Sequence, residues 1–193
     1  PGLEALKKLA NIRKGAFLGG RDIAFKLAPR LNAPGRIDDP DLTLKLLLER
    51  DPLRAKVYAE KIEALNRRRR EIADGIMKDA LERTRALYGE RPRTGIVIDG
   101  EGYHPGVLGI IASRLADRFG VPAIVLGYEE GIAIGSGRRA GAFNIHGALL
   151  DCAEYLIGFG GHEAAVGVRL EPSRVDAFRE AFAARSESLG TAP

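Results

Sequence analysis

The spacing of apolar residues indicates short helices in the first part of the chain. Leu3, Leu6 and Leu9 recur at helical spacing and predict an amphipathic helix over residues 2–10. Residues 29–38 contain too much proline and glycine for a regular element. Two further short helices are expected at residues 21–27 and 42–50.

A much longer helix is predicted next. Asp51 and Pro52 form a start signal, with aspartate at the cap and proline in the first turn. Nothing before Tyr88 stops the helix except Gly75, which costs about 1 kcal/mol relative to alanine. Such a helix would be about 55 Å long, so we interpret it as a connector between two lobes. It carries four consecutive arginines, Arg67–Arg70, for which a solvated helix surface is favoured over a face that follows a nucleic acid.

After Gly89 the pattern changes to strands that alternate with helices. Strands are expected at residues 94–99, 122–126, 132–135 and 165–170, and helices at 105–119, 146–156 and from 171 onward. A glycine-rich turn is expected between the second of these helices and the last strand. In the final helix Val175, Phe178 and Phe182 are expected to face inward. This alternation predicts an α/β domain with a mixed β-sheet flanked by helices.

The composition narrows the class of protein. Hydrophobic residues make up 45% of the chain, which is enough for a packed core. No apolar run approaches the ~20 residues that a membrane helix needs. The single cysteine, Cys152, has no partner for an internal disulfide and is expected to be buried, which fits the cytoplasm. A formal net charge of +4 weakly favours an acidic partner.

The sharpest candidate site is the run of residues 158–165, which contains Gly160-Gly161-His162. Adjacent glycines let the backbone approach a ligand closely, and successive amides in such a turn form an anion-binding concavity. A histidine directly after them is placed to donate to an oxyanion or to transfer a proton. A tight loop whose histidine caps a strand explains the same residues about as well.

Three other places combine glycine or proline with a polar donor. Ser136 and Arg138 are two residues apart in a glycine setting, where a hydroxyl and a guanidinium converge on one phosphate. Asn32 and Arg36 flank a Pro-Gly turn, which is otherwise a structural turn. His104 precedes a proline-started helix and is expected to mark the helix start rather than face a ligand. His146 is expected to cap or start its helix.

The sequence offers nothing obvious to hold a metal. A metal-dependent phosphodiesterase needs carboxylates and histidines that converge on its ions. The three histidines are far apart, and none pairs with an aspartate or glutamate at a metal-ligand spacing. Phosphate-loop, dinucleotide, serine-triad and zinc patterns are also absent from the sequence.

Four stretches, in order, resemble the RecJ family of single-strand-specific exonucleases in the DHH phosphoesterase superfamily. Residues 31–36 resemble the LNAxGR turn that ends the catalytic DHH domain, and residues 135–138 resemble the GSxR motif of the DHHA1 domain. Residues 159–167 resemble its FGGHxxAAG motif, and residues 103–114 match a fourth stretch. The resemblance implies the end of a DHH domain over residues 1–50, a long connector helix over 51–89 and a DHHA1 domain over 90–193.

The family degrades single-stranded DNA from the 5′ end with Mn²⁺ or Mg²⁺. The resemblance implies that Arg36, Ser136 and Arg138 clasp the 5′ phosphate, and that His104 also contacts the substrate. It places Asn32 and the Gly160-Gly161-His162 turn near the scissile phosphate, where His162 would stabilise developing charge as the catalytic residue.

The main departure from the family concerns the metal. Its metal-binding motifs, including DHH, precede the LNAxGR turn, so we expect the metal ligands in a missing half, joined to this chain or on a separate one. The chain alone is expected to bind single strands weakly, with strong salt dependence, and not to cut them. Arg139 stands where the family usually has serine, and Tyr103 where tryptophan is common.

Two alternatives stay open. One is a DHH/DHHA1 phosphoesterase that acts on oligoribonucleotides or nucleotides, which would not usually carry the LNAxGR turn together with a long connector. The other is a non-catalytic DHHA1 binding module, which has no reason to keep Arg36, Arg138 and His162 together.

Overall fold

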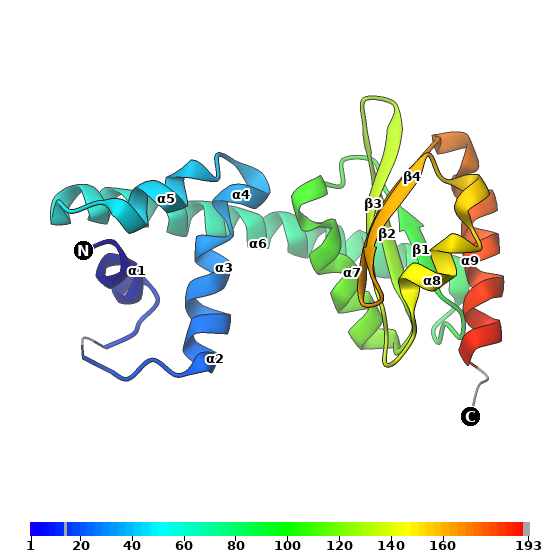
Figure 1. Cartoon of the computed structure of the whole chain (residues 1–193), viewed down its shortest axis with the longest axis horizontal. Helices are drawn as coiled ribbons and strands as arrows, with labels where there is room; N and C mark the ends of the chain where they lie inside the picture. Colours follow the sequence, from blue (N-terminus) through cyan, green and yellow to red (C-terminus); the bar gives the residue numbers. More distant parts are fainter. Residues whose placement is uncertain (14, 191–193) are drawn as a thin grey trace. The chain divides into compact units, whose positions relative to one another are not determined.

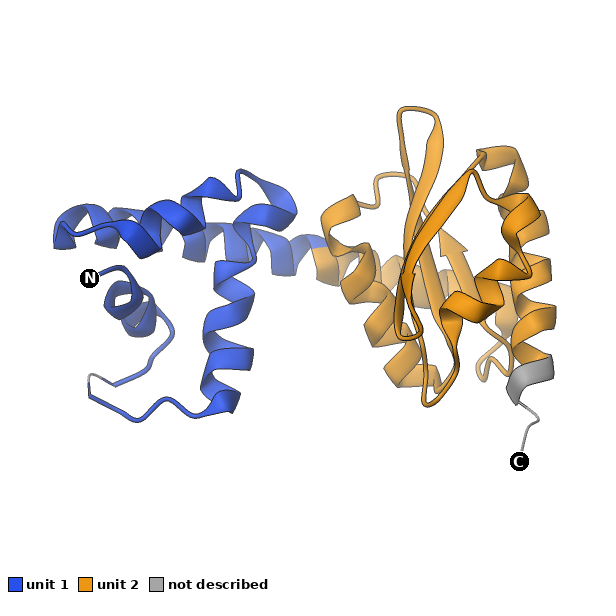
Figure 2. Ribbon diagram, in the orientation of Figure 1, with its two compact units in different colours: residues 1–72 blue, residues 73–193 orange. Residues whose placement is uncertain are grey.

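The chain separates into two compact units in the computed structural model, which describes residues 1–13 and 15–190. Unit 1 is Pro1–Ile72 and unit 2 is Ala73–Pro193 (Figure 2).

Unit 1 consists of short helices and the first part of one long helix. Its elements are α1 (Gly2–Leu9), α2 (Gly20–Asp22), the π-helix η1 (Ile23–Leu27), α3 (Ala28–Leu31), α4 (Pro34–Ile37), α5 (Asp41–Leu48) and the beginning of α6 (Pro52–Tyr88). The predicted helix over residues 21–27 is thus part of a longer helical stretch that continues into α3. The helix predicted over 42–50 begins one residue earlier and ends at Leu48.

The prediction that residues 29–38 are irregular is wrong, because α3 and α4 occupy most of that segment. Both prolines lie in the first turn of a helix. There the missing N–H is not needed and the fixed φ of proline suits the helix. Proline therefore separates two short helices here instead of preventing them.

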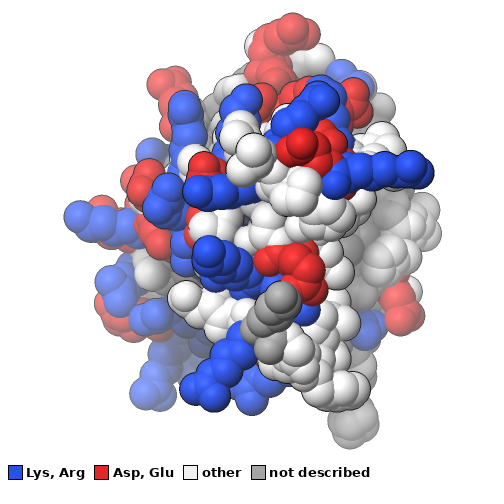
Figure 3. All heavy atoms as spheres, turned by 90° about the vertical axis from the view of Figure 1, so that its left-hand side faces the viewer, with Lys and Arg blue, Asp and Glu red and all other residues white. Residues whose placement is uncertain are grey.

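Unit 1 buries a small core and leaves many large apolar side chains exposed. Leu6, Leu46 and Ile62 are fully buried within the core cluster. The exposed ones include Leu3, Phe17, Ile23, Phe25, Leu44, Leu47, Leu48, Leu53 and Val57. Figure 3 shows uncharged surface between the lysine, arginine and acidic side chains on the face that it draws.

Helix α6 is continuous over the range predicted for the long helix. Asp51 caps it, with its carboxylate accepting from the backbone N–H groups of Leu53 and Arg54 at 2.8 and 2.9 Å. A Cβ at Gly75 would meet open space, so no packing requirement accounts for that glycine. The four consecutive arginines differ in exposure and in their partners. Arg67 and Arg68 are exposed. Arg69 is buried and donates to Asn66, and Arg70 pairs with Glu63 at 3.7 Å.

Unit 2 contains the predicted mixed α/β layer. Its strands are β1 (Ile96–Asp99), β2 (Ala123–Glu129), β3 (Ile132–Arg138), β4 (Gly158–His162) and β5 (Ala165–Leu170). They form one sheet in the order β1-β2-β3-β5-β4, in which only β1 and β2 are parallel (Figure 1). The helices are α7 (Pro105–Phe119), α8 (Ile145–Leu150) and α9 (Val175–Gly190), with 3₁₀ turns at Ala153–Tyr155 and Pro172–Arg174.

The two faces of the sheet are covered by different helices. Helices α8 and α9 form the core on one face, where Phe178 and Phe182 pack with Val166 and Val168. Val175, Phe178 and Phe182 are buried as predicted, and so is Cys152. Helix α7 contacts β2 and β3 on the opposite face. Strands β5 and β4 lie beyond it in the sheet order.

The sequence predicted four strands, and the structure has a fifth. Residues 158–162, expected as a glycine-rich turn, form the edge strand β4. Strand β3 extends three residues beyond the predicted end and includes Ser136 and Arg138. Glycine weakens a strand locally, but pairing with neighbouring strands overrides this preference. The helix predicted over 146–156 ends at Leu150, and a 3₁₀ turn follows.

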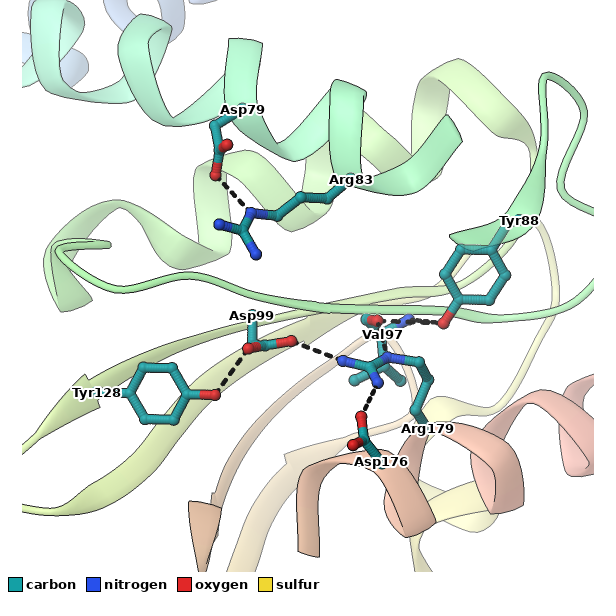
Figure 4. Close-up of polar contacts among 8 residues, drawn as sticks. All are labelled: Asp79, Arg83, Tyr88, Val97, Asp99, Tyr128, Asp176 and Arg179. Atoms are coloured by element: carbon teal, nitrogen blue, oxygen red, sulfur yellow. Dashed lines mark hydrogen bonds and ion pairs between the residues drawn. The ribbon is translucent and has the colours of Figure 1, made fainter. Parts of the chain in front are cut away.

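A polar network covers the free edge of β1 (Figure 4). The hydroxyl of Tyr88 accepts from Val97 N–H at 2.9 Å and donates to Val97 C=O at 3.1 Å. Arg179 donates to the same carbonyl at 3.0 Å and to Asp99 at 2.6 Å. Burial, with a hydrogen bond to Asp99, raises the pKa of Tyr128 to about 12. The exposed backbone edge of β1 is thereby closed to other strands.

A second tyrosine connects α6 with the start of α7. The hydroxyl of Tyr103 donates to Asp79 on α6 at 2.5 Å. That hydrogen bond lowers the pKa of Asp79, and Arg83 acts in the same direction. Burial, with the same hydrogen bond, raises the pKa of Tyr103. Tyr103, which stands where the family often has tryptophan, therefore anchors this turn through its hydroxyl.

Candidate nucleic-acid interface

The predicted phosphate-binding residues of unit 2 meet in cross-strand rows. Arg138 on β3 lies opposite Ala165 on β5, which lies opposite His162 on β4. Directly opposed residues in antiparallel strands point to the same face of the sheet. With strands about 4.8 Å apart, the backbones of Arg138 and His162 are therefore about 10 Å apart on one face.

A second row lies beside the first. Ser136 on β3 is opposite Gly167 on β5, and Gly167 is opposite Gly160 on β4. Ser136 and Arg138 are two residues apart in the strand, so their side chains share a face. The structure thus brings together Ser136, Arg138, Gly160 and His162, which are separated by up to 26 positions in the sequence.

The guanidinium of Arg138 lies against α7. An added Cβ at Gly109 of α7 would stand 2.6 Å from Nη2 of Arg138, so glycine makes room for the guanidinium there. Nη1 of Arg138 donates to the backbone carbonyl of Gly137 at 2.8 Å. This packing holds the guanidinium on the α7 face, beside the open strands β5 and β4.

The floor between these groups has almost no side chains. A Cβ at Gly158 or Gly160 would meet nothing within 4 Å, and one at Gly167 would meet only the carbonyl oxygen of Gly135 at 3.9 Å. A hollow of about 510 Å³ lies here, lined by Ile134, Gly135, Gly158, Phe159, Gly160, Gly167, Val168 and Arg169. We call Gly158, Gly160 and Gly167 the glycine strip. A ligand can approach the backbone of the glycine strip without meeting a Cβ.

The β4–β5 turn fixes the ring of His162. Nδ1 of His162 accepts from the backbone N–H of Ala164 at 3.3 Å. In the neutral ring the proton is therefore on Nε2, which becomes a hydrogen-bond donor. Gly161 has a φ of 137°, a conformation essentially confined to glycine. His162 is exposed, so its Nε2–H is available to a ligand.

Three further contacts hold that turn from outside. The backbone N–H of Arg139 donates to Ala164 C=O at 3.2 Å, and that of Ile145 donates to Glu163 C=O at 3.2 Å. The guanidinium of Arg139 pairs with Glu163 at 3.1 Å. The positive charge that Arg139 adds in place of the usual serine is thus balanced by Glu163.

The other two histidines have local structural roles. His104 is the N-cap of α7, as expected, and its Nδ1 accepts from Gly106 N–H at 3.1 Å. His146 lies in the first turn of α8, but the cap is Asn144, which accepts from Gly147 N–H at 2.9 Å. The ring of His146 packs on Phe159 instead, with the ring centroids 5.6 Å apart.

Asn32 and Arg36 belong to unit 1. Asn32 is exposed at the C-terminal end of α3, and Arg36 is exposed in α4. Ala33 and Pro34 between them are buried, so the turn that presents both side chains is anchored in the unit. Their contact with a phosphate stays a prediction, as does that of His104.

Sequence reasoning placed Gly158 in the candidate run, but it gave no role in the site to Gly167 or Gly109. Gly158 and Gly167 leave the strip open, and Gly109 accommodates Arg138. Gly167 could have been found from the alternation of residues along β5, once β4 was recognised as its partner strand. Gly109 had no local signal, because its role depends on where α7 crosses β3.

No metal centre forms within the part of the chain that the structure describes. Among residues 1–13 and 15–190, no three histidine, cysteine, aspartate or glutamate side chains group in a way that could hold an ion. These residues therefore do not fit a divalent metal, and no chemical step is assigned to one here. None of the described helices is long and apolar enough to cross a membrane.

Comparison with known proteins identifies the domain and the relatives. The DHHA1 domain model matches residues 93–187. The single-stranded-DNA-specific exonuclease RecJ of Dickeya dadantii (strain 3937) is 40% identical over 192 residues, which covers 95% of this chain and 33% of that protein. RecJ of Bacillus subtilis (strain 168) is 39% identical over 190 residues, covering 92% of this chain and 24% of that protein. The chain therefore spans a third or less of the length of these curated relatives.

The solved structures agree with the sequence relatives. RecJ from Thermus thermophilus in complex with Mg²⁺ superposes with a TM-score of 0.82 at 27% identity, covering 98% of this chain and 28% of that one. The same protein has been solved with Mn²⁺. The predicted α/β fold with a mixed sheet flanked by helices is thus confirmed. The chain carries a DHHA1 domain at residues 93–187, and almost its whole length is similar to part of the RecJ exonucleases.

Proposed function

We propose that this chain is the substrate-binding half of a 5′-to-3′ single-stranded-DNA exonuclease whose metal-binding half lies outside it. The observation that carries the proposal is the row Arg138–Ala165–His162 beside the open glycine strip. The row sets the backbones of Arg138 and His162 about 10 Å apart, with both side chains on one face of the sheet. The proposed substrate follows from the RecJ relatives, which are named for action on single-stranded DNA.

Each group has a distinct part in binding a phosphodiester chain. Arg138 supplies a planar fork and Ser136 a hydroxyl to the 5′ phosphate, because charge-assisted hydrogen bonds to phosphate are strong and directional. The Nε2–H of His162 donates to an oxygen of the scissile phosphate that gains negative charge during hydrolysis. Gly160 and Gly161 let the strand lie close to the backbone. In unit 1, Asn32 and Arg36 supply further polar contacts, and His104 contacts the strand from the start of α7.

The exposed apolar surface of unit 1 supports a missing half. Leu48, Leu53 and Phe25 are 70%, 77% and 75% exposed, and such a concentration is typical of a surface that another polypeptide covers. A largely apolar hollow of about 1040 Å³ lies in the same unit, lined by residues of α1, the residues that flank it and the start of α6. We propose that residues 1–50 complete a DHH domain, that 51–89 form the connector and that 90–193 are the DHHA1 domain. The covering DHH half, in the same chain or a separate one, would hold the Mn²⁺ or Mg²⁺.

The proposal is tested by manganese-dependent digestion of a 5′-phosphorylated, 3′-labelled single strand. The 193-residue chain is compared with one extended upstream to include the missing half. Activity is expected only in the extended chain. Arg138→Ala should weaken binding by about tenfold or more, and His162→Ala should slow cleavage by about 100-fold or more with a smaller effect on binding.

Arg174→Ala is the matched control, because Arg174 is exposed in the 3₁₀ turn before α9, away from the row. It should leave both binding and cleavage unchanged. Cleavage by the short chain would mean that it holds metal ligands of its own. Inactivity of both chains would favour a non-catalytic binding module, and preference for short ribonucleotides would favour the small-substrate phosphoesterase.

A further inference from the structure

A second hollow of unit 2 lies at the C-terminal ends of α6 and α7, apart from the rows on the sheet. It encloses about 430 Å³ and is lined by Arg85, Glu90, Arg91, Pro92, Arg118 and Phe119. Three segments supply these residues: the last turn of α6, the loop before β1 and the end of α7. Its volume lies within the range of about 300–1,000 Å³ that is usual for ligand pockets.

The charges around this hollow do not balance. Arg85 pairs with Glu90, the one acidic residue in the lining, at 3.3 Å. Arg91 and Arg118 form no ion pair with any carboxylate among residues 1–13 and 15–190. Two guanidinium-bearing residues that line one concave surface favour an anion with several acceptor oxygens, which a phosphate provides.

An aromatic ring stands next to these cations. The guanidinium carbon of Arg118 lies 5.9 Å from the centroid of the Phe119 ring, and Pro92 closes the floor as a buried residue. Proteins that bind single strands combine basic groups along the backbone with aromatic rings on which bases stack. An acidic side chain of a protein partner would use the arginines but not the ring face.

The hollow lies at the same end of the sheet as Arg138. Ile96, Ala123 and Arg138 form one row across β1, β2 and β3, and the loop before Ile96 and the end of α7 adjoin that row. Gly109, which contacts Arg138, precedes Phe119 by ten helical residues, or about 15 Å along α7. A strand that passes the end of α7 can therefore reach both places.

We propose that this hollow is a second contact site for single-stranded nucleic acid, which takes one phosphate between Arg91 and Arg118 and one base on Phe119. The identity of the ligand rests on the proposed function. The site itself rests on the unbalanced arginines and the ring. A strand bound at both places gains affinity over one that reaches only the rows on the sheet, because the second contact is intramolecular.

The test measures fluorescence anisotropy of labelled, 5′-phosphorylated oligodeoxythymidine with the 193-residue chain over a series of salt concentrations. One strand is a few nucleotides long, and the other is several times longer. Arg91→Ala and Arg118→Ala should each weaken binding of the long strand several-fold and reduce its salt slope by about one. Phe119→Leu should weaken it about tenfold with an unchanged slope. Arg114→Ala is the matched control, since Arg114 lies one turn earlier on α7 and already pairs with Asp74.

Loss of long-strand affinity with little change for the short strand supports the second site. Equal affinities of the variants and the wild-type chain for both strands would overturn it. Equal loss for both strands would also overturn it, because it would indicate a general effect of charge. Arg138→Ala tests the proposed function separately. If it weakens binding of neither strand, that function fails. The variants Arg91→Ala and Arg118→Ala would still test the second site. Thermal melting of each variant shows that the chain remains folded.

Discussion

At the scale of single residues, Gly160 and Gly161 are neighbours with different reasons to be glycine. A Cβ at Gly160 would meet open space, whereas one at Gly161 would overlap the carbonyl oxygen of Ala165. Gly161 also has a φ of 137°, which other residues avoid. Gly160 is therefore open toward a ligand, and Gly161 is required by the turn that carries His162.

This difference predicts opposite results for two similar substitutions. Gly160→Ala should change the free energy of unfolding by less than about 1 kcal/mol and weaken single-strand binding, because its methyl group stands on the strip. Gly161→Ala should cost at least about 2 kcal/mol through the strained backbone. Chemical denaturation and anisotropy titrations measure the two effects. If Gly160→Ala left binding unchanged, the strand would not lie on the strip.

The tautomer of His162 also follows from a single contact. The neutral ring has its proton on Nε2 only because Ala164 N–H occupies Nδ1, and the Arg139–Glu163 pair braces that turn. The sequence predicted His162 as a candidate donor but not the orientation of its ring. The ring orientation depends on a two-residue turn between β4 and β5, and that turn was not predicted because β4 itself was interpreted as a loop.

At the scale of secondary structure, α6 and α7 were predicted more accurately than the strands that carry the site. Pro52 and Pro105 set the starts of α6 and α7, and both helices have the predicted limits. The strands that carry the site are rich in glycine, as in Gly135-Ser136-Gly137 of β3, and local preference ended β3 too early. The pairing register that aligns Arg138 with His162 comes from contacts between distant segments, which spacing along the chain does not contain.

The hydrogen bonds of Arg179 along the edge of β1 lead to a prediction at this scale. Arg179 is 15% exposed and bonds to both Val97 and Asp99, so Arg179→Ala leaves a partly buried carboxylate and a carbonyl without that donor. We expect a loss of about 2–3 kcal/mol in the free energy of unfolding. Asp176→Ala removes the other carboxylate that pairs with Arg179, but Asp176 is 89% exposed, so less than about 1 kcal/mol is expected. Similar losses for the two variants in urea denaturation would contradict this account of the edge.

At the scale of the whole molecule, the two units differ in how completely they bury their apolar residues. Unit 2 has a sheet with packed helices on both faces, whereas unit 1 leaves Phe17 92% exposed and Leu53 77% exposed. Backbone amides exchange faster where few apolar contacts hold a segment, because local opening costs less there. We therefore expect faster hydrogen exchange in α1 and α5 than in β2 and β3.

Helix α6 provides an internal comparison, because one continuous helix runs from unit 1 into unit 2. Its end is tied to unit 2 through Tyr103–Asp79 and Tyr88–Val97, while Leu53 and Val57 near its start are exposed. Mass spectrometry of exchanged peptides should show protection that rises along α6. If the proposed upstream half covers unit 1, extension of the chain by that half should protect α1, α5 and the start of α6 and leave β2 and β3 unchanged. Uniform protection along α6 in the short chain would show that unit 1 is complete as it stands, and would remove the main structural support for a missing half.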